Sequence, residues 1–538
     1  MNLHYLAAES TGGNPILNIS VFVAFIVVTM TIVTRVSRKP QKSASEFYTG
    51  GASFSGTQNG LAIAGDYLSA ASFLGIVGAI ALTGYDGFLY SIGFFVAWLI
   101  ALLLVAEPLR NTGKFTMADV LSFRLKQRPV RVAAAFATLF VSLFYLVAQM
   151  AGAGSLVSVL LDIHEKSGQA IVVAIVGIIM IAYVLIGGMK GTTYVQMIKA
   201  VLLIGGVIIM TIIIFVAVKG NFSQLLTEAV QAHGGNEAIL EPGMKYAESD
   251  TSKLDFIALG LSLALGVAGL PHVLMRFYTV PTAKEARKSV TWAIVLIGGF
   301  YLLTLFLGYA AAAWVGPETI KNAPGGANAA APLLALELAG PIFMALISAV
   351  AFATVLAVVA GLAITASASV AHDFYNSVLR NGEATEEEQV RVSRITVVII
   401  GLVAIVLGIG AMGQNVAFLV SLAFCIAASA NVPTIMYSLY WKRFNTTGAV
   451  CSLWVGLLSA LILILLSPAV SGAETSMLPN ADFAIFPLSN PGLITIPLGF
   501  LAGIVGTYIG KPDNFDDLQA EMEVRSLTGV GVEAAVDH

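Results

Sequence analysis

The stretch GDYLSAASF (Gly65–Phe73) places an acidic residue, Asp66, inside a long apolar segment, beside a glycine and among small hydroxyl residues. A second stretch, GVAGLPHV (Gly266–Val273), interrupts another apolar segment with glycines and Pro271. Backbone groups without hydrogen-bond partners are costly in lipid, so a break in a membrane helix is tolerated only where it faces protein or a watery cavity. The two stretches therefore predict a pair of interrupted membrane helices.

The composition around these stretches is that of a membrane protein. Of 538 residues, 57% are hydrophobic and 11% are charged, whereas soluble domains carry about 25% charged residues. The mean hydropathy is +0.87. The net charge of −3 offers no basic field for nucleic acid. Soluble enzymes, nucleic-acid-binding proteins and disordered scaffolds are therefore excluded, and the expected partners are a lipid bilayer and no nucleic acid.

The cysteines and histidines of the sequence indicate neither disulfides nor a metal centre. Cys425 and Cys451 both lie in apolar stretches and cannot form a disulfide framework. No Cys/His cluster in the sequence has the spacing of metal ligands. We expect no resident metal or cofactor.

Thirteen apolar segments are long enough to cross a bilayer, which takes about 20 residues. They lie near 16–34, 55–82, 88–107, 131–160, 169–187, 194–218, 256–279, 291–315, 333–371, 395–411, 416–440, 449–467 and 492–509. The sequence thus predicts an all-α multi-pass membrane protein with 13 transmembrane helices. If the N-terminus lies outside, 23 of the 28 Lys and Arg residues fall on the cytoplasmic side. Because positive residues accumulate inside, we expect the N-terminus outside and the C-terminus inside.

The segments and loops predict six parts of the chain. They are an N-terminal segment with the first transmembrane helix (1–54), a first five-helix repeat (55–218), an extracellular loop (219–255), a second five-helix repeat (256–440), two peripheral transmembrane helices (441–510) and a cytoplasmic acidic tail (511–538). An odd number of helices in each repeat turns the second upside down relative to the first. The two interrupted segments open the two repeats, which points to a substrate site near the middle of the membrane.

Asp66 is the strongest single candidate for a functional residue. An ionisable group well inside a span costs at least about 2.5–3.5 kcal/mol and is functional by default. Asp66 either binds or gates, or it accepts hydrogen bonds from freed amides and props the break open; both roles are compatible. Ser69 and Gly269 lie at the two breaks, and Gln149, one turn after Tyr145, faces either the cavity or the core. Together with Asp66, they form the predicted substrate or gating set.

Two further polar residues follow the second break. His272 and Arg276 lie one turn apart after Pro271. The charge count predicts Arg276 to be an ordinary cation at the inner end of its span.

Three motifs carry a family resemblance. They are YSLYWKRFNTTGAVCSLWVG (Tyr437–Gly456), GGMKGTTYVQMIKA (Gly187–Ala200) and GLPHVLMRF (Gly269–Phe277). Through them the chain resembles the sodium:solute symporter family along nearly its full length, and most closely its acetate and short-monocarboxylate permease branch. The resemblance implies a leucine-transporter-like core of 5+5 inverted repeats that works by alternating access. It also implies import of acetate and related acids (propionate, pyruvate) by symport with a cation, in a prokaryotic plasma membrane.

The resemblance further implies a cation site where the broken second helix meets the ninth. The backbone carbonyls of Ala64 and Tyr67 would face this site, with Asp66 beside them and Thr354 as an oxygen donor on the ninth helix. A hard cation such as sodium wants oxygen ligands, whereas a proton needs only a titratable group such as Asp66.

Two departures from the family pattern bear on the coupling ion. The register in which relatives usually carry a Ser-Ser or Ser-Thr pair falls here on Ala357 and Val358, which have no side-chain oxygen. Thr193 stands where sodium-coupled relatives often carry Asp. Sodium and proton both stay open as the transported ion, and the departures favour the proton.

Other functions stay open beside monocarboxylate symport. The same fold could transport proline, a sugar or another small solute with sodium, or it could be a facilitator or channel for small acids. An intramembrane enzyme or a sensor is less favoured, because the sequence shows no nucleophile–base arrangement and no soluble output domain. The sequence makes no prediction of the oligomeric state.

Overall fold

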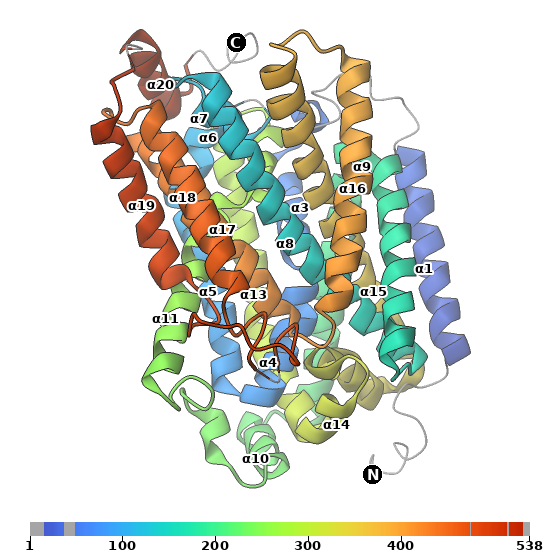
Figure 1. Cartoon of the computed structure of the whole chain (residues 1–538). Coiled ribbons are helices and arrows are strands. Elements are labelled where there is room, and N and C mark those ends of the chain that lie inside the picture. The colour runs from blue at the N-terminus through green and yellow to red at the C-terminus, as the bar shows by residue number, and fades with distance from the viewer. Residues whose placement is uncertain (1–14, 37–48, 114, 474, 514–515, 531–538) are drawn as a thin grey trace.

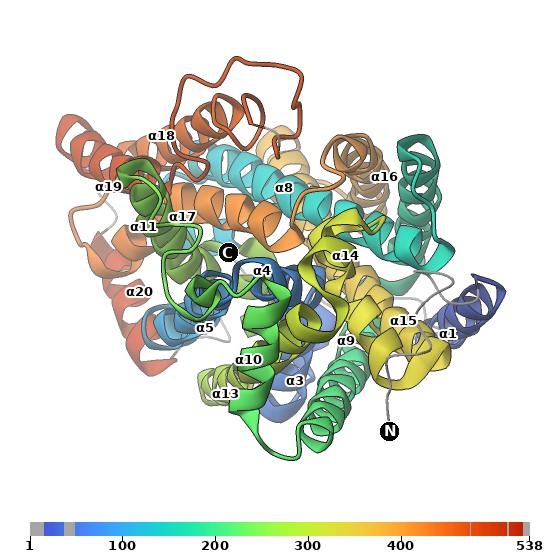
Figure 2. The same cartoon turned by 90° about the horizontal axis from the view of Figure 1, so that it is seen from below.

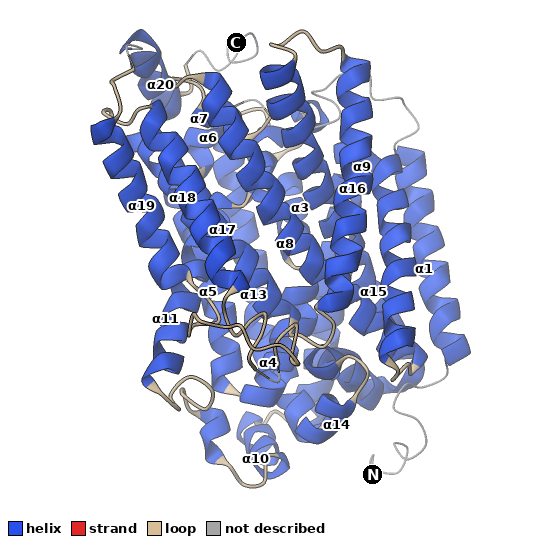
Figure 3. Cartoon of the chain, in the orientation of Figure 1, coloured by secondary structure: helices blue, strands red, loops and turns tan. Residues whose placement is uncertain are grey.

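The structure is a computed structural model that describes residues 15–36, 49–113, 115–473, 475–513 and 516–530. Its helices stand side by side in one bundle (Figure 1). Within these residues there is no β-strand, only a single bridge between Ser471 and Leu478 (Figure 3). The all-α prediction is confirmed. The predicted terminal segments 1–54 and 511–538 lie partly outside the described residues.

The helical elements follow one another along the chain, with shorter 3₁₀ and π turns marked η. They are α1 (Pro15–Val36), η2 (Gly50–Ala52), α3 (Gly56–Tyr67), η3 (Ala71–Gly75), α4 (Ile76–Thr83), α5 (Tyr85–Leu104), α6 (Ala106–Thr112), α7 (Met117–Leu121), α8 (Gln127–Leu161), α9 (Lys166–Ala217), α10 (Phe222–Ala232), η4 (Glu237–Leu240), α11 (Asp250–Gly266), η5 (Val267–Gly269), α12 (Pro271–Met275), η6 (Arg276–Thr279), α13 (Ala283–Ala310), η7 (Ala311–Val315), α14 (Pro317–Asn322), η8 (Gly326–Ala329), α15 (Ala330–Ala368), η9 (Ser369–Leu379), α16 (Glu386–Gly410), α17 (Val416–Tyr440), α18 (Thr446–Leu465), α19 (Gly492–Ile509) and α20 (Asp516–Thr528).

Among the described residues, 11 helical segments are long and apolar enough to cross a membrane, and one bent pair, Gly56–Tyr67 with Ala71–Thr83, makes a twelfth. Two of them, Lys166–Leu185 and Gly191–Ala217, lie within α9. These twelve correspond to twelve of the predicted segments. The remaining one forms α1, a helix of 22 residues. Large apolar side chains are exposed on the outer face, among them Leu103 and Val406, as a surface that contacts lipid requires.

The first predicted break lies at the end of α3. A capping box of Ser55 and Gln58 begins this helix. It ends because Leu68 leaves the helical region, with φ −70° and ψ 78°. At this break the direction of the span bends by 59°. Close packing at the break requires Gly65, since a Cβ there would lie 2.1 Å from the carbonyl oxygen of Gln196 on α9. This prediction is confirmed.

The second predicted break separates α11 from α12. The helix ends at Gly266, a 3₁₀ turn follows, and Leu270 is extended with φ −77° and ψ 112°. Pro271 then opens α12, where its fixed φ and missing N–H suit the first helical position. The freed carbonyl of Gly269 accepts a hydrogen bond from Asn431 Nδ2 of α17 at 2.8 Å. This break is confirmed as well.

The packing places both breaks inside the bundle. α17 is buried along nearly its whole length, and α18 and α19 pack against it and each other at one edge, while α1 packs on α15 and α9 at the opposite edge (Figure 2). α6, α7 and α20 lie at one end of the bundle and α10 and α14 at the other (Figure 1). The loop predicted at 219–255 is largely folded as α10, η4 and the first turns of α11.

Candidate functional site

The two broken spans bring an acidic and a basic side chain together. Asp66 is 2% exposed and Arg276 is 1% exposed. Arg276 Nε lies 3.4 Å from Asp66 Oδ2. The prediction that Arg276 is an ordinary cation at the inner end of its span is therefore wrong. A charge count assigns residues by their place along a span, and it cannot detect a guanidinium turned inward onto a carboxylate 210 residues away.

Gln196 of α9 joins this ion pair. Its Nε2 donates to Asp66 Oδ1 at 2.8 Å, and its Oε1 accepts from Arg276 Nη2. Arg276 Nη1 also donates to Thr193 Oγ1 at 2.8 Å, so Thr193 serves the guanidinium. Asn59 of α3 donates through Nδ2 to the carbonyl of Arg276 at 2.9 Å. The network ties α3, α9 and η6 together, and a buried charge pair needs such additional bonds to be stable.

The oxygens expected to bind a cation all take part in bonds within the protein. The carbonyl of Ala64 accepts from Leu68 N at 2.9 Å, and that of Tyr67 accepts from Ser69 N at 2.8 Å. The Thr354 hydroxyl donates to the carbonyl of Ala351 at 2.6 Å.

Lys199 also reaches this region. It is 1% exposed, and its Nζ donates to the carbonyl oxygen of Thr354 at 2.9 Å. Lys199 was not among the predicted site residues, because the charge count assigned it to the cytoplasmic side. The available signal was its position three residues after Gln196, immediately before the apolar run AVLLIGGV (residues 200–207).

On the other side of the α3 break lie polar side chains without partners. Gln149 of α8 is 0% exposed and His272 of α12 is 1% exposed. Neither amide atom of Gln149 and neither ring nitrogen of His272 has a hydrogen-bond partner among the described residues. An unsatisfied buried polar group costs about 1–3 kcal/mol. Four such atoms near two helix breaks are the arrangement expected of a binding site for a polar ligand.

Tyr145 links these side chains to the break. Its ring centroid lies 5.2 Å from that of His272, and its hydroxyl donates to Ser69 Oγ at 3.4 Å. Gln149 follows one turn later on the same face of α8. The structure thus brings Ser69 and Gln149 to the Tyr145 side of the break and Asp66 to the Arg276 side, whereas Gly269 is closed off by Asn431.

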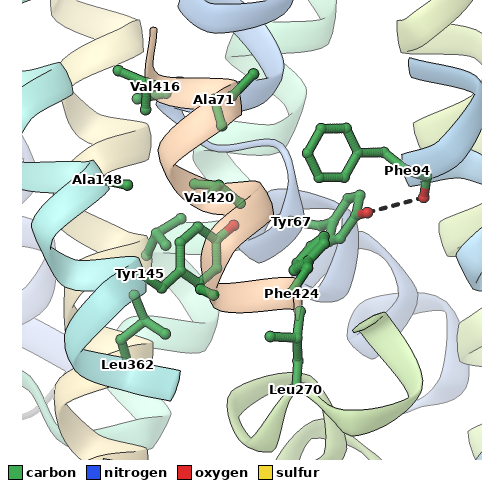
Figure 4. Close-up of a cluster of buried hydrophobic side chains, with 14 of the residues drawn as sticks. Tyr67, Ala71, Phe94, Tyr145, Ala148, Leu270, Leu362, Val416, Val420 and Phe424 are labelled. Atoms are coloured by element: carbon green, nitrogen blue, oxygen red, sulfur yellow. Dashed lines mark hydrogen bonds between the residues drawn. The ribbon is translucent and has the colours of Figure 1, made fainter. Parts of the chain in front are cut away.

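Aromatic and aliphatic side chains gather around Tyr67 and Tyr145 (Figure 4). Tyr67 stacks on Phe424 at a centroid distance of 6.2 Å, and its hydroxyl donates to the carbonyl of Phe94 at 2.9 Å (Figure 4). Tyr145 faces α17, and Leu270 lies below Phe424 in the same view. The polar groups near the break are therefore few and lie among apolar side chains, a composition that is common in binding sites for small solutes.

A second buried ionic cluster lies at the α6–α7 end. Arg131 Nη1 lies 2.9 Å from Asp119 Oδ1 and 2.8 Å from Asp373 Oδ1, and His372 Nε2 lies 3.6 Å from Asp119. Burial raises the pKa of Asp119, but the charges of Arg131 and His372 outweigh burial and hold this pKa well below its usual range. Potential ligand atoms of Asp119, His372 and Asp373 lie within 4.8 Å of one another. Arg131 already forms an ion pair with each of the two carboxylates, so we interpret the group, called the Arg131 cluster below, as a structural ion-pair network.

Comparisons with known proteins agree with this architecture. The model of the sodium:solute symporter family matches residues 47–456. The chain is 75% identical over 536 residues to the monocarboxylic acid transporter of Corynebacterium glutamicum, covering 98% of this chain and 97% of that protein. It is 48% identical over 520 residues to the uncharacterized symporter YwcA of Bacillus subtilis, covering 96% and 100%. Among solved structures, it matches a Na⁺-coupled sialic acid symporter in a substrate-bound outward-open state, with a TM-score of 0.68, 17% identity, and 92% and 98% of the two chains covered. At that identity the last match shows the fold alone.

Proposed function

The chain belongs to the sodium:solute symporter family, and from that premise we propose that it imports acetate and related short monocarboxylates, propionate and pyruvate among them, together with a cation. It is a transporter rather than an enzyme. The 75% identical relative, named a monocarboxylic acid transporter, supports this substrate class. The coupling ion of the proposal is sodium or a proton.

The observation that carries the proposal is the set of unpartnered groups on Gln149 and His272. An ionised carboxylate only accepts hydrogen bonds, a glutamine amide offers two donors, and a neutral imidazole offers one. A small monocarboxylate between these side chains would satisfy donors that the protein itself leaves unmatched. The surrounding aromatic side chains would cover its short apolar part.

We place this site in a leucine-transporter-like core of two inverted five-helix repeats, 55–218 and 256–440. Counting α1 as a crossing brings the spans to 13. The N-terminus then lies outside and the C-terminus inside a prokaryotic plasma membrane. The Asp66–Arg276 pair ties the first broken helix to the second, so alternating access must move the two together or break the pair. A monoanion carried with one cation moves no net charge, whereas a second cation would add about 2.3 kcal/mol of driving force per 100 mV.

The test is uptake of radiolabelled acetate by the full-length protein in liposomes, with sodium, pH and voltage gradients imposed separately. We expect accumulation above the equilibrium level under a sodium or a proton gradient. Unlabelled propionate and pyruvate should compete, and proline and glucose should not. Equilibration without accumulation would identify a facilitator instead. Competition by proline or glucose alone would move the substrate to another class.

A further inference from the structure

A buried lysine lies where three helices meet. Lys199 Nζ of α9 donates to the carbonyl of Thr354 on α15 at 2.9 Å. Three residues earlier on α9, Gln196 Nε2 lies 3.3 Å from the carbonyl of Ala357, three residues further along α15. The third helix, α3, packs on the same part of α9, because a Cβ at Gly65 would lie 2.1 Å from the Gln196 carbonyl. The ammonium group therefore lies at the junction of α3, α9 and α15, next to the broken part of α3.

This junction is where the family resemblance places a transported cation, and several of its oxygens already take part in hydrogen bonds within the protein. The Thr354 carbonyl accepts from Lys199, and the Thr354 hydroxyl donates within its own helix. The Tyr67 carbonyl accepts from Ser69 N at 2.8 Å and from Ser72 Oγ at 3.2 Å. On the α15 side of the junction, the positive group that contacts the carbonyl oxygen of Thr354 is therefore a side chain of the protein, the Lys199 ammonium.

The charges around the junction disfavour a further cation. Two charged side chains are bonded to this junction through Gln196, namely Asp66 on α3 and Arg276 on η6. One carboxylate thus faces two cationic side chains, and the neutral Gln196 and Thr193 complete the α9 side. In a low-dielectric interior, a sodium ion would add a third positive charge beside a single negative one. The same excess of positive charge attracts a monoanion.

We propose that the Lys199 ammonium is a built-in cation that takes the place of a transported sodium ion at the α3–α9–α15 junction, so that uptake does not depend on sodium. The inference rests on the proposed function. It selects the proton from the two coupling ions left open there. A lysine suits the place because it is a compact charge with three donors on a flexible stem.

The decisive measurement is the sodium dependence of the unaltered protein. Acetate uptake by the full-length protein in liposomes is followed under a fixed proton gradient and a clamped membrane potential, while external sodium is exchanged for choline. Coupled ligands typically change each other's binding about 5- to 150-fold, and we expect a change below the lower end of that range. A saturable sodium dependence of about fivefold or more would overturn the inference, and it would leave symport intact. Failure to accumulate acetate under any gradient would instead overturn the proposed function.

Substitution of the lysine tests whether the ammonium itself is needed. Lys199→Met keeps most of the stem and removes the charge. We expect uptake to fall by at least about fivefold at every sodium concentration. Lys284→Met, at an exposed lysine of α13, is the matched control and should keep the normal rate. A normal rate for Lys199→Met would also overturn the inference. If that variant fails to insert, the sodium dependence of the unaltered protein decides alone.

Discussion

Near the α3 break, some buried polar side chains have hydrogen-bond partners that stabilise the fold, and others have none among the described residues. Asp66 belongs to the first kind, since its two carboxylate oxygens meet Gln196 and Arg276. Gln149 belongs to the second, with no partner for its amide among the described residues. The two kinds of residue respond differently to substitution. Removing a paired group leaves its partner exposed to an apolar interior, whereas removing an unpaired group relieves a cost.

Gln149→Leu should therefore separate stability from transport. The change removes two unpartnered polar atoms and keeps the size of the side chain, so the melting temperature should stay equal or rise. Hydrogen bonds to a charged group contribute about 1.5–3 kcal/mol, which predicts a loss of about 10- to 150-fold in the uptake rate at low acetate. Ser142→Ala, at another unpartnered buried side chain of α8, is the control and should transport normally. An unchanged rate for Gln149→Leu would show that Gln149 is a core residue.

At the scale of helices, local sequence predicts the breaks and misses their contacts. Pro271 interrupts the second span through its own backbone geometry. Gly65, by contrast, lies within α3 just before the break at Leu68, and the close approach of Gln196 requires it. The pairing of Asp66 with Arg276 joins residues 210 positions apart, and no local pattern encodes it. Lys199 shows the same limit, since its place in a span suggests a cytoplasmic end and only α15 reveals its partner.

The coupling between the two broken helices can be measured with a double-mutant cycle. Asp66→Asn and Arg276→Met should each lower the melting temperature strongly, because removing one partner of a buried pair costs about 3–5 kcal/mol. Asp66→Asn combined with Arg276→Met should recover part of this loss, since neither charge is then left alone. Uptake should stay low in all three variants. Asp250→Asn, in the exposed pair with Lys253, should change stability by only about 0–1 kcal/mol. Strictly additive effects of the two buried substitutions would contradict direct coupling.

For the whole molecule, the proposed alternating access requires the two ends of the bundle to open in turn, and each end is held by its own set of bonds. At the α10–α14 end, the carboxylate of Asp86 accepts from the backbone N–H groups of Gly243 and Lys245 at 2.7 and 2.6 Å. At the α6–α7 end, the Arg131 cluster joins α7, α8 and η9. Thr116 Oγ1 adds a bond to Asp373 at 2.9 Å. The sequence predicted nothing of the Arg131 cluster, because its members come from three separate elements.

The pH dependence of the Arg131 cluster follows from Asp119, whose pKa the charges of Arg131 and His372 hold well below its usual range. A carboxyl with a depressed pKa contributes stability that is fully present above its unfolded pKa of about 3.9 and is lost as the pH falls toward the folded value. Between neutral pH and about pH 4, Asp119→Asn should therefore melt at a lower temperature than the unaltered protein, by an interval that does not shrink. Protonation of His372 in this range adds positive charge beside a carboxylate that is still ionised, and it does not narrow the interval. Below about pH 4 the difference should shrink, because the unaltered protein then also loses the charge. Melting curves in detergent from pH 7 downward measure this difference in melting temperature, with Asp250→Asn as the exposed control. If the difference already disappears between neutral and mildly acidic pH, Asp119 is not the group that Arg131 holds ionised.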